Sequence, residues 1–141
     1  MRVFFDTSAF VKRYVEEPDS GRVLALCSQA ANLGVSVILL PELVSTLRRL
    51  VRDARLTEPD YARLKSAALR DLRDADLCDL TPAVLERTVG CLERNPLRAM
   101  DAIHLGSAIV YRPDLFVTAD RRQLEAARKE GLAVEDLGAS P

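Results

Sequence analysis

Arg2-Val3-Phe4-Phe5-Asp6-Thr7-Ser8 opens the chain with an apolar run that stops at an acidic residue, and this pattern indicates the fold. The same pattern occurs twice more, where the run 35–41 precedes Glu42 and the run 115–119 precedes Asp120. Such runs are typical of strands buried in a parallel α/β sheet, in which all strand C-termini lie on one ligand-binding edge. We therefore expect these acids to converge although they are far apart in sequence.

Apolar residues alternate along the chain between strand-like runs and helix-like stripes. We expect strands at 2–6, 34–41, 77–81, 115–119 and 132–137. We expect helices at 7–17, 20–33, 42–55, 58–75, 82–94, 99–111 and 120–130, three of which begin near a proline. The pattern predicts one α/β domain over 1–137 with a parallel sheet and crossover helices, a helical hairpin over 42–75, and a short tail at 138–141.

The composition fits a single domain with its own core, since 48% of the 141 residues are hydrophobic and 29% are charged. A net charge of −1 excludes a global attraction to nucleic acid or to anionic membranes, so such a partner would need a local basic patch.

The cysteines Cys27, Cys78 and Cys91 lack metal-binding or redox spacing and predict reduced thiols. No apolar stretch approaches the roughly 18 residues of a membrane span, and we expect a cytoplasmic protein with no membrane partner.

A fourth acid, Asp101, interrupts a helical stretch of small and apolar residues from Met100 to Leu105. A mid-helix aspartate in such surroundings neither caps a helix nor joins a charged face, and burying it without a partner costs several kcal/mol. Four converging carboxylates repel one another unless a cation neutralises them, and hard divalent cations prefer oxygen ligands. The sequence therefore predicts a Mg²⁺ or Mn²⁺ site.

Three of the acids also have ordinary structural explanations. Asp6 and Asp120 are each credible helix N-caps, with Gln123 completing a capping box after Asp120. Glu42 in a first helical turn would interact well with the helix dipole. The only histidine, His104, lies three residues after Asp101; it is a possible general base, but a hydrogen-bonded structural role is the better explanation.

Nine basic residues are candidates for a phosphate-binding rim around the acids, although an ordinary solvated position is the better explanation for any one of them. They are Lys12, Arg13, Arg48, Arg49, Arg52, Arg98, Arg112, Arg121 and Arg122.

The chain resembles the PIN-domain ribonucleases, and more narrowly the VapC-type toxins of toxin–antitoxin pairs. The resemblance rests on four segments in order, namely 3–9, the isolated Glu42, Met100-Asp101-Ala102-Ile103-His104-Leu105 and 116–120, and it spans nearly the whole chain. It implies a five-stranded parallel sheet flanked by helices, with a protruding helical hairpin. It also implies a Mg²⁺- or Mn²⁺-dependent endoribonuclease that acts on RNA, forms a homodimer and is neutralised by a small DNA-binding antitoxin.

By position, the acidic quartet of that family is matched by Asp6, Glu42, Asp101 and Asp120, which would be both catalytic residues and metal ligands. Thr7, Ser8 and Thr118 match its supporting hydroxyl residues. The alternative is a catalytically silent module that keeps the acids and only sequesters RNA or an antitoxin. Receiver domains and aspartyl phosphatases are disfavoured, because Asp6 is followed by Thr7-Ser8 and no second acid is present.

Overall fold

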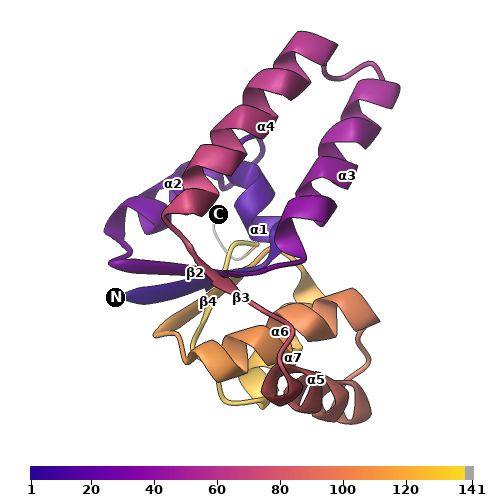
Figure 1. Cartoon of the computed structure of the whole chain (residues 1–141). Coiled ribbons are helices and arrows are strands. Elements are labelled where there is room, and N and C mark those ends of the chain that lie inside the picture. The colour runs from indigo at the N-terminus through magenta and orange to yellow at the C-terminus, as the bar shows by residue number, and fades with distance from the viewer. Residues whose placement is uncertain (139–141) are drawn as a thin grey trace.

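The computed structural model describes residues 1–138, which form three layers with helices on both faces of a sheet (Figure 1). The strands are β1 (Arg2–Phe5), β2 (Asn32–Ser36), β3 (Asp76–Cys78), β4 (Leu115–Thr118) and β5 (Val134–Asp136). The helices are α1 (Thr7–Phe10), the 3₁₀ turn η1 (Val11–Arg13), α2 (Ser20–Gln29), α3 (Leu39–Arg52), α4 (Glu58–Arg73), α5 (Pro82–Arg94), α6 (Ala99–Tyr111) and α7 (Arg121–Lys129). The predicted α/β architecture is confirmed, whereas most of the expected tail, 139–141, lies outside the described residues.

All neighbouring strands pair in parallel, in the order β3-β2-β1-β4-β5. The chain therefore builds outward from β1 through β2 to β3, and then returns to place β4 on the other side of β1. Parallel sheets bind ligands where the strand order reverses, in the crevice outside the strand C-termini. Here that point is the junction of β1 and β4, where Asp6 and Thr118 lie.

Consecutive residues of β1 supply two separate cores, because side chains on a strand alternate between its faces. Phe5 packs with Leu26 and Leu43 in the core formed with α1 to α4. Phe4 packs with Phe116 and other residues in the core formed with α5 to α7, and the two rings are stacked with centroids 6.0 Å apart. Burial of β1 on both faces fixes the position of the residue that follows it.

The helices α5 and α6 approach each other closely at Gly106. A Cβ atom added to this glycine would lie 2.3 Å from Oγ1 of Thr88 and 2.9 Å from the backbone nitrogen of Thr88. The Thr88 hydroxyl is itself fixed, since it donates a hydrogen bond to the carbonyl of Val84 at 2.8 Å. Only glycine fits at this crossing, and the two helices are held together as a pair.

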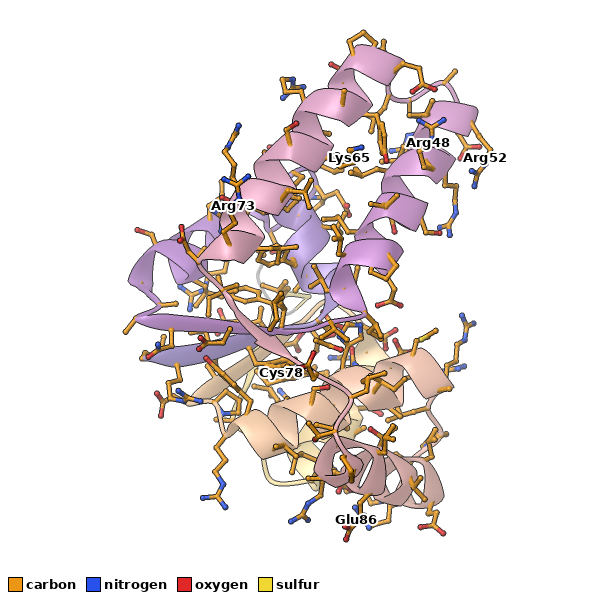
Figure 2. The ribbon with its side chains drawn as sticks, in the orientation of Figure 1. Arg48, Arg52, Lys65, Arg73, Cys78 and Glu86 are labelled. Carbon is orange, nitrogen blue, oxygen red and sulfur yellow. The ribbon has the colours of Figure 1, made fainter. Side chains whose placement is uncertain are left out.

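The predicted hairpin is formed by α3 and α4, which project together away from the sheet (Figure 1). Near the sheet the two helices bury Leu43, Leu47 and Ala68. Toward the tip Leu50, Leu56 and Tyr61 are partly buried, and Arg48 forms an ion pair with Glu58 at 2.8 Å. Figure 2 shows Arg48 and Arg52 near the free end of α3.

Two predicted elements differ most from the structure; in addition, the helix expected at 20–33 ends at Gln29 and the strand expected at 77–81 ends at Cys78. The run 34–41 was expected to be a strand, but β2 ends at Ser36 and α3 begins at Leu39, which places Glu42 in a helix rather than after a strand. A short apolar run does not distinguish a buried strand from a buried helical turn, and Pro41 fits the first turn because its missing N–H would have no partner there. The helix expected at 7–17 ends by Arg13, and Glu17 precedes Pro18, a position that disfavours helical backbone.

The cysteines Cys27, Cys78 and Cys91 are free thiols, and Cys91 is fully buried. Within residues 1–138, no helix combines the length and the apolar character that crossing a membrane requires.

Candidate functional site

Asp6 follows β1 directly, and its side chain is buried with 2% of the residue exposed. Its carboxylate caps α1 by accepting a hydrogen bond from the Ala9 amide at 3.0 Å. The hydroxyls of Ser8 and Thr118 also donate to it, at 2.8 and 2.6 Å respectively. Burial raises the pKa of Asp6 to about 6, although His104 and these donors act in the opposite direction. The predicted cap is thus present, and burial at the sheet edge disfavours the ionised form of the same carboxylate.

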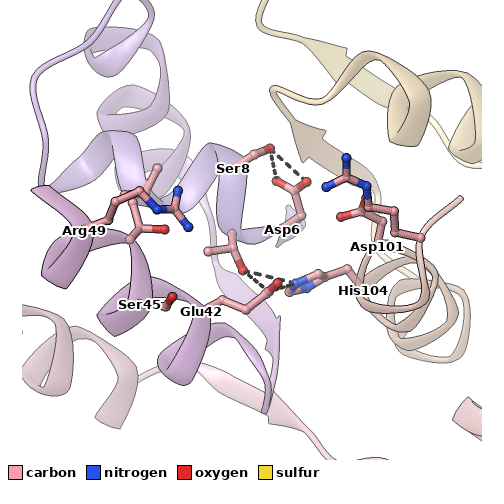
Figure 3. A pocket seen from close by; sticks show the side chains of 11 residues that line it. Asp6, Ser8, Glu42, Ser45, Arg49, Asp101 and His104 are labelled. Atoms are coloured by element: carbon pink, nitrogen blue, oxygen red, sulfur yellow. Dashed lines mark hydrogen bonds and ion pairs between the residues drawn. The ribbon is translucent and has the colours of Figure 1, made fainter.

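Glu42 lies in the first turn of α3 and meets two side chains from other elements. Its Oε1 atom accepts a hydrogen bond from the Thr7 hydroxyl at 2.7 Å and lies 2.5 Å from Nε2 of His104 (Figure 3). Burial raises the pKa of Glu42, but the contacts with His104 and Thr7 outweigh burial and leave that pKa lowered. Glu42 is therefore held ionised between α1 and α6.

His104 is 1% exposed, and its Nδ1 atom has no hydrogen-bond partner within residues 1–138. With a carboxylate beside Nε2 and no acceptor beside Nδ1, the tautomer that fits carries its proton on Nε2 and donates to Glu42. Nε2 then already carries a proton, and Nδ1, although unprotonated, is buried away from any substrate hydroxyl. The geometry favours the structural role of the sequence analysis over the general base.

Asp101 was expected in mid-helix but is the third residue of α6, within the first turn, where the helix dipole favours an acid. Its side chain is half-buried, and within residues 1–138 the carboxylate has no hydrogen-bond or ion-pair partner. Burial raises the pKa of Asp101, and the negative charges of Asp120 and Glu42 raise it further. The side chain is thus an unpaired acid beside other acids.

Asp120 caps α7 by accepting a hydrogen bond from the Gln123 amide at 3.0 Å. The capping box expected here is wrong, since the Asp120 amide donates to Thr118 Oγ1 instead. The Gln123 side chain donates to the backbone carbonyl of Asp101 at 2.6 Å. Gln123 therefore ties α7 to the start of α6, a link that capping logic alone did not reveal.

A cavity of about 420 Å³ opens at this edge of the sheet (Figure 3). Three of the four predicted acids line it, namely Asp6, Glu42 and Asp101. The fourth, Asp120, lines an adjoining cavity of about 330 Å³, and Asp101 belongs to both linings. The structure therefore distributes the four acids over two adjoining cavities, and Asp101 lines both of them.

The sequence analysis did not single out Ser45 and Thr46, which line the first cavity with Arg49. All three share a helix face with Glu42, because they follow it by three, four and seven residues. That spacing is the signal that could have identified them. Of the nine candidate basic residues, four line one or both of these two cavities: Arg49, Arg98, Arg121 and Arg122.

The donor set at this site fits a hard divalent cation in its chemistry, because it consists of carboxylate oxygens, one of them unpaired and two with raised pKa values. As the side chains lie, however, no three Asp, Glu, His or Cys residues within 1–138 are arranged closely enough to hold an ion. Binding an ion here would therefore require carboxylates to rotate toward it.

Comparisons with known proteins identify similar chains. The sequence matches the PIN domain family over residues 3–129. It is 35% identical over 146 residues to Ribonuclease VapC49 of Mycobacterium tuberculosis, covering 99% of this chain and 98% of that protein. The fold is similar to the crystal structure of VapC20 of Mycobacterium tuberculosis, described as a sarcin–ricin loop cleaving toxin, with a TM-score of 0.69, 17% identity and coverage of 93% and 96%. It is also similar to a chain of VapBC2 from Rickettsia felis bound to promoter DNA, with a TM-score of 0.68, 16% identity and coverage of 96% and 98%.

Proposed function

The chain belongs to the PIN domain family, and from this premise we propose that it is a metal-dependent endoribonuclease and the toxin of a toxin–antitoxin pair. The observation that carries the proposal is the convergence of Asp6, Glu42 and Asp101 on one cavity at the switch point of the sheet. A relative named as a ribonuclease, similar over essentially its full length, supports RNA as the substrate.

Asp6, Glu42, Asp101 and Asp120 are the residues that would hold Mg²⁺ or Mn²⁺. When bound, such an ion would stabilise charge on the phosphoryl group and lower the pKa of an attacking water. The chain's own side chains prepare the site. Ser8 and Thr118 fix the carboxylate of Asp6, while Thr7 and His104 bind one oxygen of Glu42 and leave the other without a hydrogen bond from residues 1–138.

The Asp101 carboxylate contributes the unpaired charge in the middle of the two cavities. Burial raises the pKa of Asp101 and the charges of Asp120 and Glu42 raise it further, so a cation that neutralises the group would be bound with a gain in free energy. Cation binding and relief of carboxylate repulsion are then the same event.

We propose a small DNA-binding antitoxin as the partner, supported by the structural likeness to a chain of a VapBC complex bound to promoter DNA. A homodimer and a cytoplasmic location are proposed on the family resemblance. Light scattering of the purified chain tests the dimer, and co-purification with the product of the adjacent reading frame tests the antitoxin.

The enzymatic proposal is tested by incubating purified protein with RNA in Mg²⁺, in Mn²⁺ and in excess chelator. We expect cleavage only with a metal, and its loss in Asp6→Asn and Asp101→Asn without loss of folding, because an amide supplies a neutral oxygen where an ion needs charge. Undiminished cleavage in chelator or by either variant contradicts the metal site. Binding of RNA with no cleavage under any condition would instead identify the catalytically silent module.

A further inference from the structure

The two cavities beside the carboxylates form one trough, because Arg98 and Asp101 line both of them. The trough begins at Arg49 on α3, passes the carboxylates, and continues to Arg121 and Arg122 at the start of α7. In Figure 3 the side chain of Arg49 extends from α3 into the pocket. Positive groups thus lie at both ends of the trough, with the acids between them.

The arginines of the trough differ in their pairing from three of the five candidate basic residues outside it. Three of these residues are already in ion pairs: Lys12 with Glu17, Arg13 with Asp71, and Arg48 with Glu58. Within residues 1–138, Arg49, Arg98 and Arg122 form no ion pair, and Arg121 pairs with Asp136. Three guanidinium groups are therefore available to an anion that enters the trough.

We propose that the trough is the path of single-stranded RNA, with Arg49 binding a phosphate on one side of the cleaved bond and Arg98 with Arg122 binding phosphates on the other. This inference rests on the proposed function. A chain of net charge −1 has no global attraction for RNA, and its carboxylates repel phosphate, so binding depends on local guanidinium groups.

The linings also indicate how RNA is recognised. No aromatic side chain among residues 1–138 lines either cavity, so base stacking, the usual sequence-tolerant grip on single strands, is not provided there. A cavity of about 420 Å³ is of small-ligand size and admits part of a single strand rather than a duplex. Contacts in the trough are therefore predominantly to phosphates.

The test measures binding of a fluorescent single-stranded RNA by anisotropy over a salt series, in the Asp6→Asn background so that the RNA stays intact. We expect Arg49→Gln, Arg98→Gln and Arg122→Gln each to weaken binding by about tenfold, as for loss of one charge-assisted hydrogen bond. Each should also reduce the slope of log K against log salt by about 0.7, the value for one phosphate contact on a single strand. Arg49→Lys should keep most of the slope.

Two arginines outside the trough are matched controls. Arg52 lies on α3 near the hairpin end and Arg128 lies on α7, and neither lines the two cavities. Arg52→Gln and Arg128→Gln should leave affinity and salt slope unchanged. If the trough variants behave like these controls, the RNA does not follow the trough.

The kinetic test uses the otherwise unchanged protein, in which Arg49→Gln should raise KM for cleavage by a larger factor than it lowers kcat. A fall in kcat with KM unchanged would overturn the assignment of Arg49 to RNA binding. Absence of cleavage by the unsubstituted chain with every metal would refute the proposed function, whereas the anisotropy series would still decide whether the trough binds RNA.

Discussion

Nε2 of His104 lies 2.5 Å from Oε1 of Glu42, and this contact joins α6 to α3 across the candidate site. The first prediction is that His104 positions Glu42. His104→Asn should reduce kcat for RNA cleavage by about 10- to 100-fold, the usual effect of removing a group that orients a ligand. His104→Gln places an amide donor nearer to the lost Nε2 and should restore part of the activity.

Because the chain has a single histidine, ¹⁵N chemical shifts report its tautomer without assignment. We expect the Nε2–H form in the unsubstituted chain. Equal activity of the Asn and Gln variants, or an Nδ1–H tautomer, would contradict the positioning role.

The second prediction concerns the products. His104 offers no accessible base to the RNA 2′-hydroxyl, because Nε2 is bonded to Glu42 and Nδ1 is buried, so water is the expected nucleophile. Cleavage should leave a 5′-phosphate and a 3′-hydroxyl, which end-labelling with polynucleotide kinase before and after phosphatase treatment distinguishes. A predominant 2′,3′-cyclic phosphate would instead show acid–base chemistry on the 2′-hydroxyl.

The third prediction is a pH dependence of stability in chelator. Burial raises the pKa of Asp6 to about 6 from 3.8, so the protonated acid stabilises the fold below about pH 4 and this contribution is lost as pH rises through 6. A shift of about 2 units corresponds to about 3 kcal/mol. Relative to Asp6→Asn, the free energy of unfolding of the unsubstituted chain should fall by about this amount between pH 4 and pH 8.

Urea denaturation of both proteins at each pH measures the difference. Parallel pH profiles for the two proteins would show that Asp6 is not the group responsible. Adding Mg²⁺ at pH 8 should recover stability in the unsubstituted chain more than in the variant, because an ion that binds the native state stabilises it.

The fourth prediction separates the two roles of Asp120. Asparagine caps a helix about as well as aspartate, so Asp120→Asn should leave the metal-free melting temperature unchanged or slightly higher. The stabilisation by Mg²⁺ should become smaller, because one carboxylate of the site is gone. Thermal melts with and without Mg²⁺ decide, and an identical metal-induced shift in both proteins would remove Asp120 from the site.

The fifth prediction concerns the crossing of α5 and α6. Gly106→Ala places a methyl group 2.3 Å from Thr88 Oγ1 and should destabilise the fold by about 1 to 3 kcal/mol, as overpacking does. Gly21 is the matched control, because an added Cβ there meets nothing within 4 Å and the residue lies in α2. Gly21→Ala should leave the free energy of unfolding unchanged or raise it by up to about 1 kcal/mol. Similar losses in both variants would show that the close approach is not the cause.

The sequence predicted the parallel sheet well because apolar runs ending in acids reflect two-sided burial, as at Phe4 and Phe5. It placed Glu42 less well, since the run before it is divided between a strand and a helical turn that look alike in one dimension. The contacts between Glu42, Thr7 and His104 could not be predicted, because they depend on how three helices are placed in space. Local rules likewise assigned the Gln123 side chain to its own helix end, whereas it bonds to Asp101.

The close crossing at Gly106 has a consequence for the stiffness of the site. Asp101 and His104 belong to α6, which is braced along its length by α5, whereas Glu42 and Arg49 belong to α3, whose far half extends beyond the sheet. The side of the site formed by α6 is thus expected to be more rigid than the side formed by α3. We expect a molecule that binds near Arg52 and moves α3 to change the distance between Glu42 and Asp101 without contacting either residue. Amide hydrogen exchange should be faster along the outer turns of α3 than along α6.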